Sequence, residues 1–184
     1  MARKTALLLL AILLAGCATL GGPTFTPGVT TQAEVLAYKG APGYVSEEPK
    51  GEKRLFWPTG PSGTSTIMAR IDKSQRLIGY EEVLDMEHFA GIQADMSMDQ
   101  VLRMIGPSYP AWTTYFKSRD ELVWEWRYCD AWSSGARFYV LFDGTSKKVR
   151  STMSLSEAQM SGYRTAPPCG QTYIRLGSVT ATSK

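Results

Sequence analysis

The sequence predicts an α+β fold made of two tandem repeats, each with one or two short helices packed on a three-stranded antiparallel sheet. Internal similarity is the main evidence, because residues 31–40 align without gaps on residues 97–106 at an offset of 66. Both segments open with Thr or Ser, carry Glu or Gln three residues later, continue with Val-Leu and stop at Gly. This pattern is a capping box followed by a residue that tolerates the left-handed conformation, so each repeat is expected to open on a short capped helix.

Three β-rich segments follow each of these helices. Residues 54–57, 65–72 and 76–78 correspond to residues 121–124, 136–143 and 148–150, and the offset grows from 66 to 72 through insertions in the loops. Asp143-Gly144 is a strong turn signal, and short connections imply antiparallel neighbours. Residues 85–90 are expected to add a short helix before the second repeat. We therefore place the repeats at residues 25–84 and 85–155, with a C-terminal tail over residues 156–184.

The N-terminus has the composition of a secretory signal. Arg3 and Lys4 precede ten apolar residues, 6–15, which are too few to span a bilayer as a helix. Residues 14–17, Leu-Ala-Gly-Cys, resemble a bacterial lipobox, which implies cleavage after residue 16 and lipidation of Cys17; the alternative is an unlipidated signal with a chance cysteine. Residues 17–24 would then be a tether. By the sorting rule known for enteric lipoproteins, Ala18 in place of Asp points to the periplasmic face of the outer membrane.

Two cysteines remain after Cys17. In an oxidising compartment, Cys129 and Cys169 are expected to form one disulfide that ties the C-terminal tail to the second repeat. The alternative is a pair of free buried thiols.

Charge and composition argue against several classes of protein. Without Arg3 and Lys4, 18 basic residues face 17 acidic ones and no basic cluster is present, so we expect no nucleic-acid partner. A single histidine and three cysteines exclude multi-histidine and four-cysteine metal sites. The sequence contains no phosphate-binding loop, nucleophile elbow or zinc-protease motif. We therefore expect no catalytic residue, metal or cofactor, and a protein that is not an enzyme; His88 as a general base is the weaker alternative.

Aromatic residues supply the candidate binding surface. Trp124, Trp126 and Tyr128 share one face of a strand and are expected to lie in the core under the helix. The preceding segment contains two prolines and has no clear period, so some of its rings are expected to be exposed. Because Trp and Tyr are enriched at binding hot spots, we assign a partner-binding surface to Trp112, Tyr115 and Phe116.

A longer pattern carries a family resemblance. It runs through Phe89, Ile92, Asp95-Met96-Ser97, Gln100-Val101-Leu102, Gly106-Pro107, Trp124, Trp126, Phe138–Phe142, Asp143-Gly144 and Val149, and the first repeat keeps Gly28 and Gly40-Ala41-Pro42. This pattern resembles the SmpA/OmlA (BamE-like) outer-membrane lipoprotein domain. Two such units in tandem resemble the architecture of the beta-lactamase inhibitory protein.

The resemblance implies a protein-binding role in the cell envelope. The expected partner is an envelope protein, for example one of the outer-membrane barrel assembly machinery, and the expected role is outer-membrane protein assembly or envelope integrity. Two alternatives stay open: an inhibitor-like module that binds a periplasmic enzyme or toxin, and a hydrolase or small-ligand carrier that uses a cleft between the repeats.

Overall fold

A computed structural model describes residues 23–161 and Cys169. The predicted signal peptide, Cys17, most of the tether and most of the C-terminal tail lie outside the described residues. The predicted domain boundaries therefore stay predictions.

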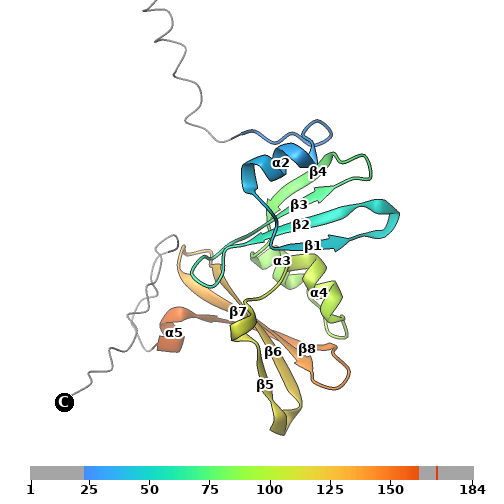
Figure 1. Ribbon diagram of the computed structural model, residues 1–184. Coiled ribbons are helices and arrows are strands. Elements are labelled where there is room, and N and C mark those ends of the chain that lie inside the picture. The colour runs from blue at the N-terminus through green and yellow to red at the C-terminus, as the bar shows by residue number, and fades with distance from the viewer. Residues whose placement is uncertain (1–22, 162–168, 170–184) are drawn as a thin grey trace, which may run out of the picture.

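Two separate four-stranded antiparallel sheets form the fold (Figure 1). The first unit contains α2 (Gln32–Lys39), β1 (Tyr44–Glu47), the 3-10 turn η2 (Pro49–Gly51), β2 (Lys53–Pro58), β3 (Thr66–Ile71) and β4 (Leu77–Glu82). The second contains α3 (Met86–Ala90), α4 (Met98–Ile105), η3 (Pro110–Trp112), β5 (Thr114–Phe116), η4 (Lys117–Arg119), β6 (Glu121–Cys129), β7 (Gly135–Asp143), β8 (Val149–Ser156) and α5 (Glu157–Ser161). The strand orders are β1-β2-β3-β4 and β5-β6-β7-β8, so every neighbour in a sheet is also the neighbour in sequence.

Matching local details show that the two units repeat one pattern. Thr31 and Ser97 both form complete capping boxes, and both helices end at a glycine with positive φ, 77° at Gly40 and 71° at Gly106. An isolated bridge joins the residue before each helix to the residue before the last strand, Thr31 to Arg76 and Ser97 to Lys148. A register shift also interrupts the last strand pair of each sheet, at residues 70/71 and 141/142.

The predicted number of strands was wrong, because each sheet has four rather than three. The additional strands are β1, which pairs with β2, and β5, which pairs with the first residues of β6. Strand β1 has four residues and β5 has three, too few to show a convincing alternation. Each forms a hairpin with the strand that follows it, so these strands were missed because they are short and not because their partners are distant in sequence.

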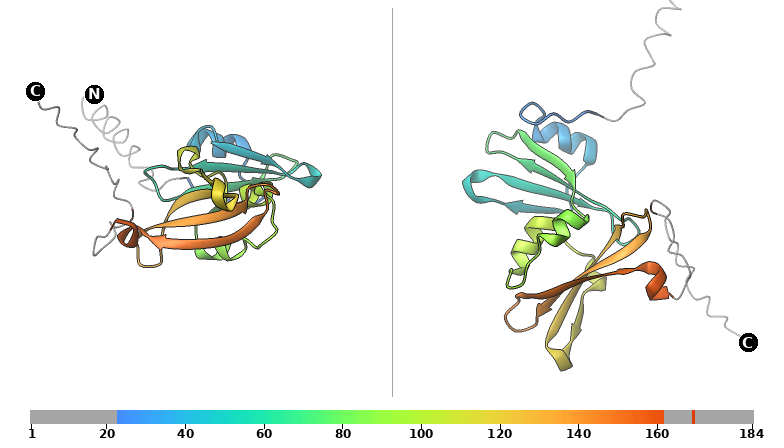
Figure 2. Two further views of the ribbon diagram at one scale, coloured as in Figure 1. Left: turned by 90° about the horizontal axis from the view of Figure 1, so that it is seen from below. Right: turned by 180° about the vertical axis from the view of Figure 1, so that it is seen from behind.

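The layers follow the order α2, first sheet, α3 and α4, second sheet (Figures 1 and 2). The first sheet is therefore covered on both sides, and Leu55, Phe56 and Trp57 are all buried although they follow one another on β2. Leu55 and Trp57 pack in a cluster with Val35 of α2. Phe56 belongs to a second cluster, which it shares with Ile105 of α4.

The second sheet packs its aromatic face against the same two helices. Phe89 of α3 stacks on Phe138 with 3.9 Å between the ring centroids and 6° between the ring planes. Trp126 and Tyr128 are 3% and 4% exposed, and Trp124 packs against this cluster as a partly buried residue. The prediction that these three rings lie in the core under the helix is confirmed.

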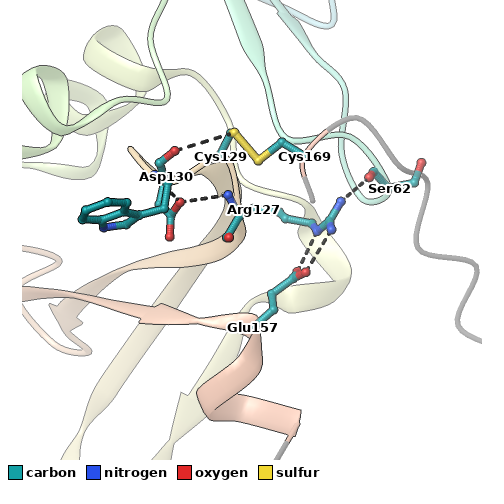
Figure 3. Close-up of a disulfide and its surroundings, with 8 residues drawn as sticks. Ser62, Arg127, Cys129, Asp130, Glu157 and Cys169 are labelled. Atoms are coloured by element: carbon teal, nitrogen blue, oxygen red, sulfur yellow. Dashed lines mark hydrogen bonds and ion pairs between the residues drawn. A yellow bond between two sulfur atoms is a disulfide. The ribbon is translucent and has the colours of Figure 1, made fainter. Parts of the chain in front are cut away.

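The predicted disulfide between Cys129 and Cys169 is present, with 5.7 Å between the Cα atoms (Figure 3). It closes a separation of 40 residues, and constraining the unfolded chain in this way contributes on the order of 3–4 kcal/mol. The backbone N–H of Cys169 also donates to the carbonyl oxygen of Ser133 at 2.9 Å. Cys169 is therefore attached to the end of the β6–β7 hairpin by two independent contacts.

Gly106 provides a test of the close contact between the units. A Cβ at this position would lie 2.8 Å from Cδ1 of Phe56, and the residue has φ +71°. Gly40 has φ +77° and open space around it. We expect Gly106→Ala to lower the free energy of unfolding by roughly 3 kcal/mol, from backbone strain and overpacking together, and Gly40→Ala by about 1 kcal/mol, from strain alone. Urea denaturation measures both values, and equal losses at the two glycines would contradict the packing described.

Candidate functional site: a cleft between the two units

A cleft of about 250 Å³ lies where the first sheet, the segment after α4 and strand β6 meet. Both units contribute to its wall, so it exists only in the assembled chain. Most of the side chains around it are apolar or aromatic, among them Pro58, Leu84, Pro107, Tyr109, Trp112 and Trp126. Ligand-binding pockets in proteins have this character, with a small number of polar groups among apolar walls.

The segment after α4 forms one wall because its sequence cannot continue the helix. Gly106 ends α4, and Pro107 and Pro110 lack the amide that a longer helix would need. The chain instead makes the short turn η3, in which the N–H of Trp112 donates to the carbonyl oxygen of Tyr109 at 2.9 Å. The rings of Tyr109 and Trp112 meet edge to face with 5.3 Å between centroids, which places two aromatic rings side by side at the cleft.

Trp112 is held in place by an arginine. The guanidinium carbon of Arg137 lies 4.1 Å from the centroid of a Trp112 ring, a cation–π contact. Arg137 in turn donates to Glu125 at 2.5 Å and to Glu157 at 2.8 Å. The orientation of the indole is therefore set by a guanidinium that is itself fixed by two carboxylates.

Arg127 connects three parts of the chain beside the cleft (Figure 3). Its side chain is 4% exposed and forms a two-pronged ion pair with Glu157 of α5, at 2.6 and 2.9 Å. Its remaining terminal nitrogen donates to the carbonyl oxygen of Ser62, in the β2–β3 loop of the first unit, at 2.6 Å. Arg127 therefore fixes α5 and the first unit to β6 at the same time.

The titrating groups of this network have shifted pKa values. Burial alone would raise the pKa of Glu157, but hydrogen bonds and charge from Arg127 and Arg137 outweigh burial and lower it. Burial raises the pKa of Glu125 although Arg137 opposes the change. Burial, reinforced by the nearby Glu125, raises the pKa of Tyr139 to about 12. At neutral pH Glu157 is thus anionic and Tyr139 is protonated, and the two arginines pair with the two glutamates.

Chemically, the cleft is suited to holding an uncharged group. Its charged side chains, Glu125 and Arg127, are both engaged in ion pairs that lie within the chain. The ring of Trp126 also lines the cleft, and its indole N–H is buried and has no hydrogen-bond partner within the described part of the chain. In residues 23–161 and Cys169, no group of three or more His, Cys, Asp or Glu side chains is placed to hold a metal ion.

The three residues predicted to form one binding surface come from two elements, η3 and β5. Trp112 is half-buried at the cleft, whereas Tyr115 and Phe116 lie on β5, 53% and 41% exposed. Because they are neighbours on a strand, their side chains point to opposite faces. Tyr115 donates its hydroxyl to Asp120 at 2.7 Å, and Phe116 lies under the guanidinium of Arg119. A role in binding stays a prediction for all three.

Sequence reasoning missed the residues that complete the cleft. Tyr109 lies in the aromatic segment before Trp112 and was not assigned to the binding surface, and Pro58 contributes from the other unit, 51 residues earlier. His88, considered as a general base, instead lies with Nδ1 2.9 Å from the carboxylate of Asp85, the residue that caps α3. Trp132 was also missed; it is 87% exposed at the turn between β6 and β7.

Comparison with known protein families, with curated proteins and with solved structures finds no match to the chain. None of the helices among the described residues is long and apolar enough to cross a membrane.

The ion pairs of Glu157 provide a pH test. Because the pKa of Glu157 is lowered in the folded chain, its contribution to stability is complete above the ordinary carboxyl pKa of about 4.3 and is lost as pH falls through the lowered value. We expect Glu157→Gln to lower the free energy of unfolding at pH 7 by about 3 kcal/mol, since it removes the carboxylate that Arg127 and Arg137 share. This difference from the parent chain should shrink below about pH 4.

Urea denaturation at pH 7 and at pH 3 measures the effect. Glu47→Gln is the control, because Glu47 forms an exposed pair with Lys53 and its loss should change stability by no more than about 0.5 kcal/mol. A Glu157→Gln deficit that is the same at both pH values would show that the carboxylate charge does not hold α5 in place.

Proposed function

We propose that this chain is a lipid-anchored protein on the periplasmic face of the outer membrane, and that it binds an envelope protein through the cleft between its units without catalysing a reaction. Its role would be support of outer-membrane protein assembly or of envelope integrity, as its resemblance to the BamE-like lipoproteins suggests. The lipobox-like sequence that ends at Cys17 supports the anchor, and the Cys129–Cys169 disulfide is weak support for an exported protein.

The main support for a binding role is the aromatic cleft, whose charged side chains form ion pairs within the chain. An engineered cavity of about 150 Å³ holds benzene, so a cleft of about 250 Å³ has room for one bulky side chain of a partner. The ion pairs of Glu125 and Arg127 leave no unbalanced charge at the site, which favours an uncharged aromatic or branched aliphatic side chain. Tyr and Trp beside such a pocket are the residues that most often dominate binding energy.

Replacement of the cleft aromatics tests this proposal. We expect Tyr109→Ala combined with Trp112→Ala to reduce, by about tenfold or more, the amount of a different outer-membrane protein recovered with the full-length chain after cross-linking in cells. Tyr38→Ala is the control, since Tyr38 is 56% exposed on α2 and does not line the cleft. Thermal unfolding confirms that the variants fold.

Two results would refute the proposal. One is unchanged recovery of the same protein by the folded double variant. The other is failure of the parent chain to fractionate with the outer membrane or to cross-link to any other protein there.

A further inference from the structure

Trp132 is the most exposed of the large hydrophobic side chains that the structure describes, at 87%. It occupies the tip of the β6–β7 turn, beyond the disulfide-linked end of β6. A tryptophan side chain buries about 150–250 Å² when it docks. While the side chain stays in water, the protein does not gain the favourable free energy that burying this area would contribute. The exposed indole is therefore a candidate for contact with another molecule.

Four hydrogen bonds hold the turn that presents Trp132. A carboxylate oxygen of Asp130 accepts from the backbone N–H groups of Trp132 and Ser134, both at 2.9 Å. Asp130 N–H donates to the carbonyl oxygen of Ser134, and Ser133 N–H donates to that of Asp130. The hydrogen bond from Cys169 to Ser133 and the disulfide between Cys169 and Cys129 stabilise the same hairpin. Since the backbone is ordered before contact, docking of the indole costs little additional backbone entropy.

The cleft described above matches this indole in size and in chemistry. Its volume of about 250 Å³ exceeds the roughly 150 Å³ that accommodates a benzene ring, so the larger bicyclic ring has space. Tyr109 and Trp112 offer aromatic partners, and the hydroxyl oxygens of Ser65 and Ser108 in the lining can accept from an indole N–H. The indole is uncharged, which suits a site whose own charges are paired.

The two features do not meet within one molecule, since Trp132 is not among the residues that line the cleft. Arg127, which lines the cleft, and Trp132 are five residues apart on one hairpin, and the braced turn directs the indole into solvent. We propose that the cleft of one molecule binds Trp132 of a second copy, and that the cleft of the second copy binds Trp132 of the first. A two-fold arrangement allows both contacts to form at once, as in other isologous dimers.

The area involved indicates a reversible dimer. Two indoles of about 150–250 Å² each, together with similar areas on the two clefts, give roughly 600–1,000 Å² in total. Stable complexes bury about 1,200–2,000 Å², so this contact is weak in solution. This inference goes beyond the proposed function and does not require it, although a partner side chain in the cleft would compete with the second copy.

Complementation between variants tests the inference. Two full-length copies with different affinity tags are co-expressed and cross-linked with formaldehyde in cells, and capture of one copy by the tag of the other is measured. We expect Trp132→Ser in both copies to reduce capture at least tenfold, and Ser108→Arg in both copies, which blocks the cleft, to do the same. A Trp132→Ser copy together with a Ser108→Arg copy keeps one intact indole and one open cleft, so capture should return to an intermediate level.

This design separates a specific contact from misfolding, because a misfolded variant would not complement. The inference is overturned if the mixed pair is captured as poorly as the two matched pairs. It is also overturned if the parent copies do not capture each other, or if Trp132→Ser leaves capture unchanged. The readout is the second tagged copy, so these results do not depend on whether the chain binds a different envelope protein.

Discussion

The contact of Phe56 with the end of α4 is the constraint on which the arrangement of this protein depends. Phe56 lies on the face of the first sheet opposite α2, in one buried cluster with Val101 and Ile105 of α4. Gly106 makes the contact possible, since a side chain there would collide with the ring of Phe56. Arg54 adds a hydrogen bond from β2 to the carbonyl oxygen of Arg103 at 2.8 Å. The helices of the second unit therefore pack against both sheets.

This shared layer explains how repeats of about 65 residues form a stable fold. A single unit of that size buries little of its surface, and the face of the first sheet that carries Phe56 and Met68 would be exposed without the second unit. The cleft forms where the two units meet, because the segment after α4 must pass beside the first sheet before it reaches β5. Beside the cleft, Arg127 of the second unit donates to the carbonyl oxygen of Ser62 of the first unit, and Glu157 holds its guanidinium in place.

Features encoded locally could be predicted from the sequence. The paired capping boxes, the glycines that end α2 and α4, the aromatic face of β6 and the disulfide follow from short patterns or from the number of cysteines. The β1 and β5 strands could not be predicted because they are too short to show an alternation, and the cleft could not because it depends on contacts between residues far apart. The cleft joins Pro58 to Tyr109, and nothing in either local sequence indicates that they meet.

The predicted binding surface shows a different limit of sequence reasoning, while a binding role of its residues stays a prediction. Tyr115 and Phe116 were grouped with Trp112 by proximity in sequence, but a short strand sends adjacent side chains to opposite faces. Had Thr114–Phe116 been recognised as a strand, the alternation would have separated them. Trp132 carried a usable signal, since it stands in a short polar segment, Asp-Ala-Trp-Ser-Ser-Gly, that favours an exposed turn.

The most direct test of the shared core is amide hydrogen exchange of the full chain carrying Leu55→Ala. Leu55 packs only in the cluster beneath α2, so the substitution removes contacts from the first unit alone. A Leu→Ala change in a core costs about 2–5 kcal/mol. If the two units unfold together, the slowest amides of β6 and β7 should lose protection along with those of β2 and β3, by roughly 30-fold or more. Loss of protection confined to β2 and β3 would show that the units are independent and would contradict this account.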